Sequence, residues 1–225
     1  MSDQPLMIQL RPHQQQAVNA MWDNDRGQII VPTGGGKTIC MIQDLIHQHA
    51  VPIGRTSVVV APRILLAEQL CSEFLEIVNT THTHVMHVHS GETQHFSTTK
   101  PDNIHMFANT ARTAGENCII FTTYHSLHRV QEADIEVNTI YFDEAHNSVQ
   151  RNFFPATEFF AGDADRKYFF TATPKHSLTV FKPGMNDPEV YGQVICNVPA
   201  PKLVEQVIFF HLKLWSRIYL LVMLS

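Results

Sequence analysis

The chain has 225 residues, 44% of them hydrophobic and 16% charged, with a formal net charge of −5 at pH 7. This composition predicts a folded globular protein with room for one α/β domain, or at most two small ones. It excludes a basic protein that binds nucleic acid through its overall charge, so any such contact must come from a local patch.

Along the chain, short apolar runs alternate with segments of helical periodicity. Helices are expected over Arg11–Asn24, Lys37–His49 and Ile64–Val78. Strands are expected at Ile29–Val31, Ser57–Ala61, Thr83–Val88, Cys118–Thr122, Thr139–Phe142 and Tyr168–Thr171. This alternation predicts an α/β fold with a mainly parallel sheet and helices on both faces. In such sheets, ligands bind beyond the carboxyl ends of the strands.

Less regular segments lie between and after these elements. Residues 91–117 are polar and predict an irregular excursion with one short helix, for which Thr99 is the expected N-cap. Further on, the sequence predicts another excursion over Pro183–Glu189, a strand at Val190–Asn197 and a helix at Pro201–Gln206.

The cysteines and the N-terminus indicate the compartment. Cys40, Cys71, Cys118 and Cys196 are scattered without a CxxC pair. This favours reduced thiols over a disulfide framework or a zinc site. The polar N-terminus lacks the pattern of a signal peptide, so a cytoplasmic protein is expected, in the host cytoplasm if it is viral.

A glycine-rich run, Val31-Pro32-Thr33-Gly34-Gly35-Gly36-Lys37-Thr38, separates the first predicted strand from the helix that follows it. A strand, a loop ending in Gly-Lys-Thr and a helix together bind a nucleoside triphosphate. The glycines let backbone N–H groups wrap the phosphates, and the helix N-terminus adds its positive dipole end. Lys37 is expected at the β- and γ-phosphates and Thr38 on Mg²⁺. The strict pattern begins with Gly, and Val31 stands there instead.

Two further motifs follow predicted strands. Asp143-Glu144-Ala145-His146 comes after the strand ending at Phe142, where Asp143 is expected to coordinate Mg²⁺ and Glu144 to act as general base on the attacking water. By itself, this acidic pair is better explained as the cap of a surface helix, but after a phosphate-binding loop the Mg²⁺ role is favoured. Thr171-Ala172-Thr173-Pro174 follows the last predicted strand and offers two hydroxyls that can link the nucleotide site to a moving neighbour. The alternative is an ordinary strand-ending turn.

The order GGGKT, APR, TTYHSL, DEAH and TATP resembles the first motor domain of superfamily 2 DEAD/DEAH-box helicases and translocases, a RecA-like P-loop NTPase domain. No single motif is specific, but the combination is. Within that superfamily the chain is most similar to the phage recombination helicase and the type III restriction-type helicases. The segment Leu10 to Gln14 resembles the Leu-Arg-x-Tyr-Gln element found upstream, with His13 in the place of Tyr. The resemblance covers about residues 8–206.

The resemblance implies ATP and Mg²⁺ as cofactors and DNA, or alternatively RNA, as partner. It implies that Gln14 contacts adenine, with Arg11 beside it. It also implies that His146, Thr171 and Thr173 couple hydrolysis to domain movement. The loops that resemble nucleic-acid contacts are Pro62-Arg63, Ser90-Gly91 and Thr122-Thr123-Tyr124. Backbone N–H groups, hydroxyls and one Arg suit sugar-phosphate contact without base reading, although each loop alone is as well explained as a plain connection.

Two residue clusters are given a structural interpretation. His82 and His84 share one face of a predicted strand, whereas His87 and His89 share the other. Four ligands would not converge without a bulge, so a solvated strand or loop is favoured over a zinc site. The pairs Phe153-Phe154 and Phe159-Phe160 are expected in the core or on a lobe-packing surface, rather than stacked on bases.

A superfamily 2 motor works between two lobes, the second of which supplies arginine fingers. Residues 1–206 are expected to form lobe 1, with no second lobe in the sequence, so that a partner lobe would act in cis or in trans. Residues 207–225 are abruptly apolar and are expected to lie outside the motor fold, in a truncated or frame-shifted product. A segment buried on the domain is an alternative. A membrane anchor is disfavoured, because Lys213 and Arg217 would each cost about 2.5–3.5 kcal/mol at a bilayer centre.

The leading hypothesis is the ATP-binding lobe of a helicase or translocase, weak or inactive by itself because an arginine finger contributes about 10³–10⁵ in rate in related systems. The alternative is a truncated, non-catalytic module that binds ATP and nucleic acid. A third hypothesis, a P-loop ATPase that acts on proteins, is disfavoured by the APR and TTYHSL loops.

Overall fold

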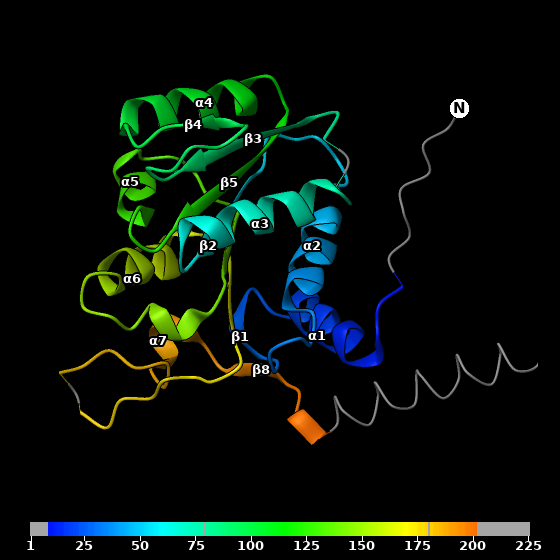
Figure 1. Ribbon diagram of the computed structural model, residues 1–225, viewed down its shortest axis with the longest axis vertical. Helices are drawn as coiled ribbons and strands as arrows, with labels where there is room; N and C mark the ends of the chain where they lie inside the picture. The colour runs from blue at the N-terminus through cyan, green and yellow to red at the C-terminus, as the bar shows by residue number, and fades with distance from the viewer. Residues whose placement is uncertain (1–8, 79, 180, 202–225) are drawn as a thin grey trace, which may run out of the picture.

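The computed structural model describes residues 9–78, 80–179 and 181–201. Within them the chain forms a single eight-stranded sheet in the order β4-β3-β5-β2-β6-β7-β1-β8, and every pair of neighbouring strands is parallel (Figure 1). The strands are β1 Arg26–Ile30, β2 Thr56–Ala61, β3 Thr83–Val88, β4 Phe96–Ser97, β5 Asn117–Thr123, β6 Thr139–Phe142, β7 Arg166–Thr171 and β8 Val194–Asn197.

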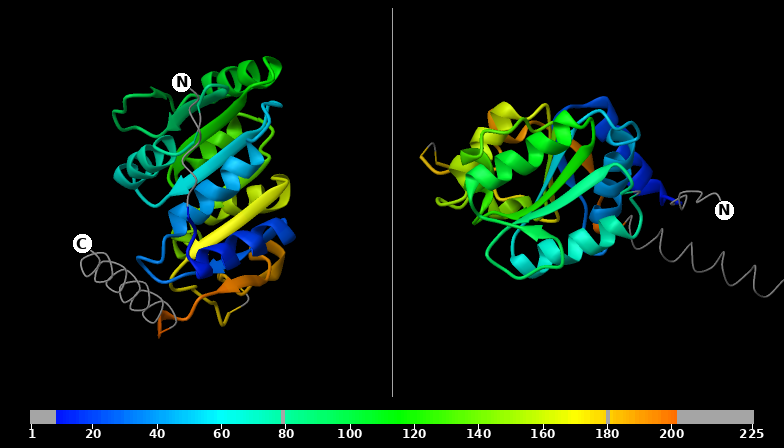
Figure 2. Two further views of the ribbon diagram at one scale, coloured as in Figure 1. Left: turned by 90° about the vertical axis from the view of Figure 1, so that its right-hand side faces the viewer. Right: turned by 90° about the horizontal axis from the view of Figure 1, so that it is seen from above.

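Helices cover both faces of the sheet (Figure 2). One face carries α1 Pro12–Asp23, α2 Lys37–Gln48 and α3 Ile64–Leu75. The other carries α4 Pro101–Thr113, α5 Leu127–Glu132, α6 Phe154–Asp163 and α7 Pro188–Tyr191. The predicted α/β class, with a RecA-like parallel sheet between two helical layers, is confirmed.

The core is divided by the sheet because successive side chains of a strand point to opposite faces. In β2, Val58 and Val60 pack toward α4 and α5, whereas Val59 and Ala61 pack toward α2 and α3. All six residues of β2 are buried, as the continuous β-branched run predicts for a central parallel strand. The helices of each layer are therefore held by their own apolar cluster.

Several boundaries differ from the sequence-based expectation. The N-cap of α4 is Lys100 rather than Thr99, because Pro101 already occupies the first helical position. The predicted strand at Val190–Asn197 is wrong in its first half, where α7 ends at Tyr191 and Gly192 takes φ +66° before β8 begins. The helices α5 and α6 and the two-residue strand β4 were not expected. Short segments of this kind gain their stability from packing rather than from local propensity.

Two predictions fall mainly outside the described residues. The apolar segment 207–225 lies entirely beyond them, and the helix expected at Pro201–Gln206 has only its first residue within them. Among the described residues, no helix combines the length and the apolar character needed to cross a bilayer.

The strand order sorts the predicted motifs into two adjacent groups. The glycine-rich loop, the DEAH segment and the TATP segment follow β1, β6 and β7, which are neighbours in the order β6-β7-β1. The loops predicted to contact nucleic acid follow β3, β5 and β2, which are neighbours in the order β3-β5-β2. Because all these strands are parallel, their carboxyl ends meet at one edge of the sheet, where ligands of such folds bind.

Candidate nucleotide-binding site

The glycine-rich loop turns sharply between β1 and α2. Gly34 and Gly36 have φ +78° and +80°, which glycine adopts without steric cost. Gly36 is also the N-cap of α2, and a Cβ there would lie 2.2 Å from Gln14 Nε2. The Gly35 N–H donates to Pro32 O at 2.9 Å and closes the turn. The loop therefore needs glycine at position 36 for both its conformation and its close approach to α1.

Side chains of α1 contact the backbone of this loop. His13 Nε2 lies 2.8 Å from Gly35 O, and Gln14 Nε2 donates to the same carbonyl at 3.4 Å. Gln14 Oε1 accepts the backbone N–H of Arg11 at 2.8 Å. His13 and Gln14 are both buried, whereas Arg11 is exposed. Sequence reasoning did not assign His13 to the site, and its only signal was its position beside Gln14.

A chain of polar contacts joins the three motifs. Lys37 Nζ pairs with Glu144 Oε1 at 2.9 Å, and His146 Nδ1 lies 3.4 Å from Glu144 Oε2. The same His146 nitrogen lies 3.0 Å from the Thr171 hydroxyl. Thr171 Oγ1 in turn accepts the backbone N–H of Thr173 at 3.2 Å. The glycine-rich loop is thus linked through DEAH to TATP across β1, β6 and β7.

The backbone is strained at Glu144. Its φ of +46° and ψ of +52° are left-handed, a conformation that costs a residue with a Cβ about 1–2 kcal/mol. The following residues, Ala145–Asn147, form a 3-10 turn in which Asn147 N–H donates to Glu144 O at 2.9 Å. Strain of this kind persists where the surroundings fix it and often marks functional sites.

The charges of the site perturb one another. Burial and, to a smaller extent, the neighbouring Glu144 carboxylate together raise the pKa of Asp143 to about 6, against the opposing effect of Lys37. Burial lowers the pKa of His146, against the attraction of Glu144. Two adjacent carboxylates, of which only Glu144 pairs with Lys37, form a site that favours an added cation.

The residues predicted to contact nucleic acid differ in exposure. Arg63 and Ser90 are exposed, and Pro62 and Gly91 are half-buried. Thr122, Thr123 and Tyr124 are all buried. The Thr122 hydroxyl donates to Val88 O at 2.8 Å, and the Tyr124 hydroxyl donates to Asp143 O at 2.9 Å. These side chains therefore hold β3, β5 and β6 together and present no exposed surface to a phosphate.

The four histidines in and beside β3 were expected to be solvated, and this expectation is only partly met. They alternate as predicted, since His84 contacts Phe107 of α4 whereas His87 stacks on Phe121 on the α3 face. His87 and His89 are not solvated, however, and both are buried. Burial, together with His89 and His95, lowers the pKa of His87 to about 4. The missing information was Glu68 of α3, which lies beside both rings although it is remote in sequence.

The phenylalanines are distributed between core and surface. Phe153 and Phe160 are buried in the cluster beneath α6, and Phe154 packs against it. Phe159 is 39% exposed and meets Phe160 edge to face. The core position expected for these phenylalanines is therefore confirmed for Phe153 and Phe160.

Solved structures show the same fold. A nuclease-deletion mutant of the type ISP restriction-modification enzyme LlaGI, in complex with a DNA substrate mimic, superposes with a TM-score of 0.72 at 23% identity over 89% of this chain and 21% of that chain. The UvsW helicase from bacteriophage T4 gives 0.57 at 15% identity over 83% of this chain and 60% of that chain. The Pyrococcus furiosus Hef helicase domain gives a TM-score of 0.57 at 20% identity, over 86% of this chain and 39% of that chain.

The chain spans about a fifth of LlaGI and 16% of LlaBIII, a related ATP-dependent enzyme bound to DNA. No curated protein matches it. The sequence family described as "Type III restriction enzyme, res subunit" matches residues 7–176. That range includes the glycine-rich loop, DEAH and TATP, the motifs joined by the contacts above. The chain therefore belongs to the type III restriction enzyme res subunit family, and these residues have the RecA-like fold seen in the Hef and UvsW helicase structures.

Proposed function

We propose that this chain is the ATP-binding lobe of an ATP-dependent helicase or translocase that hydrolyses ATP to move on nucleic acid when it is paired with a second lobe. The observation that carries the proposal is the continuous contact from Lys37 through Glu144 and His146 to Thr171. It joins a phosphate loop to a carboxylate pair and to a hydroxyl turn that can transmit a change at the nucleotide.

The residues present fit a Mg²⁺–ATP complex. Thr38 and Asp143 would supply the hydroxyl and carboxylate oxygens that Mg²⁺ prefers. Burial is the main cause of the raised pKa of Asp143, and a bound cation would stabilise its charged form. The ion would neutralise charge on the phosphates. The loop from Pro32 to Thr38 would surround the phosphates through the backbone N–H groups of residues 33–38, with Lys37 on the β- and γ-phosphates. Gln14 and Arg11 would contact the adenine.

Lys37 and Glu144 form an ion pair at 2.9 Å. The γ-phosphate of a bound ATP would compete for Lys37, because it carries more negative charge than one carboxylate. Glu144 would then be free to accept a proton from the attacking water as general base. His146, between Glu144 and Thr171, would relay the new position of Glu144 to the TATP turn. In this way hydrolysis would be coupled to movement.

The nucleic-acid surface would be built on the neighbouring strands β3, β5 and β2. Arg63 and Ser90 are exposed there, and Pro62 and Gly91 flank them. Thr122, Thr123 and Tyr124 would act through the backbone and through their support of β5 and β6. DNA is the favoured partner because LlaGI is described with a DNA substrate mimic and LlaBIII bound to DNA, and RNA is the alternative.

Catalysis would require a second RecA-like lobe in cis or in trans. In the described part of the chain, the ion pairs recorded for Lys37 and Glu144 involve each other and His146, and none brings in an arginine. An arginine finger from a second lobe would supply that charge. Residues 1–206 would form lobe 1, and residues 207–225 would lie outside it.

The test is an ATP-binding and hydrolysis assay of the full chain with single- and double-stranded DNA and RNA. We expect Mg²⁺-dependent ATP binding that Lys37→Ala abolishes, salt-dependent binding of polynucleotide, and slow turnover. Equal ATP binding by the wild type and Lys37→Ala would refute the nucleotide site. Fast turnover stimulated by polynucleotide and lost in Lys37→Ala would refute the need for a second lobe.

A further inference from the structure

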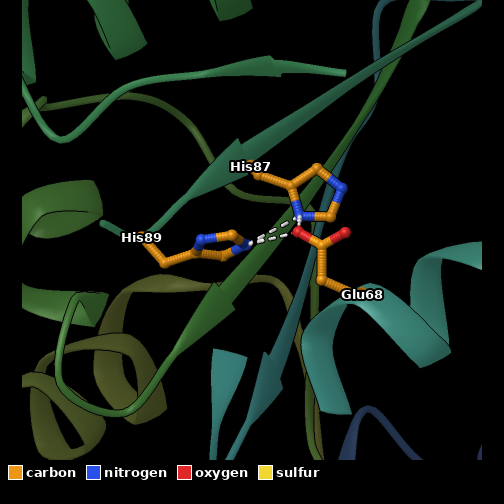
Figure 3. Close-up of side chains that lie close together, drawn as sticks. All are labelled: Glu68, His87 and His89. Atoms are coloured by element: carbon orange, nitrogen blue, oxygen red, sulfur yellow. Dashed lines mark hydrogen bonds and ion pairs between the residues drawn. The ribbon is translucent and has the colours of Figure 1, made fainter. Parts of the chain in front are cut away.

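A second polar cluster lies away from the nucleotide site, where the end of β3 meets α3. Figure 3 shows His87, His89 and Glu68 with their polar atoms turned toward one another. His87 Nδ1 and His89 Nε2 are 3.0 Å apart, Glu68 Oε1 is 3.4 Å from His89 Nε2, and it is 3.9 Å from His87 Nδ1. Each residue thus contributes one ligand-type atom to a common point.

The local structure explains why these side chains converge. His87 lies in β3 and His89 directly follows it. Because they are two residues apart, their side chains project to the same face of the sheet. That face lies under α3, and Glu68 is in the second turn of this helix. The His87 ring is fixed between Phe121 and His95, with ring centroids 5.6 and 5.8 Å away. The two histidines are therefore held rigidly in the core, whereas Glu68 reaches them from the surface.

The spacing matches the dimensions of a tetrahedral metal site. Zinc–nitrogen bonds of about 2.0–2.1 Å place two ligand atoms about 3.3 Å apart. The three observed separations, 3.0, 3.4 and 3.9 Å, lie on either side of this value. A small movement of Glu68 toward His87 would bring both separations of its Oε1 close to the tetrahedral value.

One of the ligand atoms is also without a compensating hydrogen bond. Within the described residues, the buried Glu68 Oε1 has no hydrogen-bond partner, and neither has His87 Nε2. The polar contacts of Glu68 Oε1 are the ion pairs with His87 and His89 given above, and a bound cation would satisfy the carboxylate oxygen more fully than these longer contacts do. Two imidazoles and one carboxylate are the ligand set of open zinc sites.

We propose that Glu68, His87 and His89 bind a divalent transition-metal ion of the zinc class. Glu68 and His87 also line a cavity of about 730 Å³, together with Cys71, Thr93 and His95, which leaves room for water or one further ligand. Imidazole ligands select zinc-like ions over the Mg²⁺ of the nucleotide site. The site does not depend on the proposed ATP function.

Metal binding at this site would act on the loop after β3. His89 Nδ1 lies 3.2 Å from the backbone nitrogen of Gly91 and accepts its N–H. A metal on Nε2 displaces the proton from that nitrogen, so the neutral ring carries its proton on Nδ1, facing the Gly91 N–H. The N–H groups of His89 Nδ1 and Gly91 would then both be donors and could not hydrogen-bond to one another, so the Gly91 amide would turn away. Occupancy of the site would therefore change the conformation of Ser90-Gly91.

The same strand offers an internal control. His82 and His84 contact Glu116 on the opposite face, each through a different carboxylate oxygen. These side chains are more exposed, at 61% and 42%, than those of His87 and His89. Replacing His84 removes a histidine from β3 without touching the proposed ligands.

The experiment is calorimetric titration of Zn²⁺ into the full, chelator-treated chain without a polyhistidine tag, repeated with Co²⁺ and read by visible absorption. We expect one ion per chain with tetrahedral Co²⁺ bands. Glu68→Gln keeps the size of the side chain and should weaken binding at least tenfold, as should His87→Ala, whereas His84→Ala should bind as the wild type does.

Glu68 is only partly buried, so Glu68→Gln tests the proposal even if His87→Ala does not fold. A second readout is the amide signal of Gly91, which should shift in the wild type at a lower Zn²⁺ concentration than in Glu68→Gln. Unchanged affinity in Glu68→Gln, weakened affinity in His84→Ala, or no Zn²⁺ uptake by the wild type would each overturn the proposal. None of these outcomes bears on ATP binding.

Discussion

At the scale of single residues, the proposed chemistry depends on one ion pair. Lys37 and Glu144 come from different motifs and meet at 2.9 Å. Each is proposed to have a separate task once ATP is bound, Lys37 on the phosphates and Glu144 on the water. Replacements at these two positions should therefore fail at different steps.

Lys37→Ala removes the charge that holds the phosphates, so ATP affinity should fall at least about tenfold. Glu144→Gln keeps the shape of the side chain but not the base, so ATP should still bind while hydrolysis falls by about 10²–10⁴. Nucleotide binding by fluorescence, together with single-turnover hydrolysis with enzyme in excess, separates the two steps. Loss of ATP binding in Glu144→Gln would contradict the role given to Glu144.

The glycines of the loop allow a matched pair of substitutions. Gly34 and Gly36 both have positive φ, so alanine at either position should cost about 1–2 kcal/mol of stability. A Cβ at Gly34 meets nothing within 4 Å, whereas one at Gly36 meets Gln14 Nε2. Gly36→Ala should therefore also displace Gln14 and weaken ATP binding more than Gly34→Ala. Urea denaturation and ATP titration of both variants check this, and equal effects would show that the contact with Gln14 is unimportant.

At the scale of elements, buried side chains connect the strands that carry the two groups of motifs. Tyr124 follows β5, in the group proposed to face nucleic acid, yet its hydroxyl bonds the backbone of Asp143 after β6. Thr122 bonds the end of β3 in the same way. The loops that bind nucleotide and those proposed to bind nucleic acid are therefore in direct mechanical contact.

Tyr124→Phe should destabilise the protein by about 1–2 kcal/mol, because the Asp143 carbonyl loses a buried partner. The matched control is Tyr168→Phe, whose hydroxyl bonds the carbonyls of Met21 and Asn24 away from the nucleotide site. Both variants should lose stability, but only Tyr124→Phe should weaken Mg²⁺–ATP binding. If the two variants bind Mg²⁺–ATP equally, Tyr124 is a packing residue only.

At the scale of the whole molecule, folding and protonation are linked through buried histidines. His49 follows α2, and its Nε2 lies 2.9 Å from the Ser57 hydroxyl of β2. Burial, with a smaller contribution from Arg55, lowers the pKa of His49 to about 4 from the model-compound value of 6.5. Between these values the unfolded chain binds a proton that the folded chain does not bind.

The stability contributed by neutral His49 is therefore present above pH 6.5 and is lost as the pH falls toward 4. We expect the free energy of unfolding of the wild type to fall by about 2 kcal/mol more than that of His49→Gln over this interval. Urea denaturation at a series of pH values measures the difference, to which other histidines contribute equally in both proteins. Parallel pH profiles for the two proteins would contradict the shift assigned to His49.

Much of the fold could be read from local patterns. The strands β3 and β6 begin and end as predicted, since β-branched and aromatic runs bounded by polar residues mark buried strands. The glycine-rich loop was recognisable because a strand, a Gly-Gly-Gly-Lys-Thr run and a helix follow one another, and in the structure Gly34 and Gly36 have positive φ. The elements that were missed, such as α5 and β4, are short and depend on neighbours that are remote in sequence.

The sequence by itself determined the parallel α/β architecture and the motifs that mark a superfamily 2 motor, because both are set by short-range periodicity and by residue types at fixed spacing. Only the tertiary structure decided which side chains meet. It buried Tyr124 against Asp143, placed His13 on Gly35 and brought Glu68 to His87 and His89. Such contacts depend on strand order and helix placement, which the packing of the whole sheet fixes and no local pattern encodes.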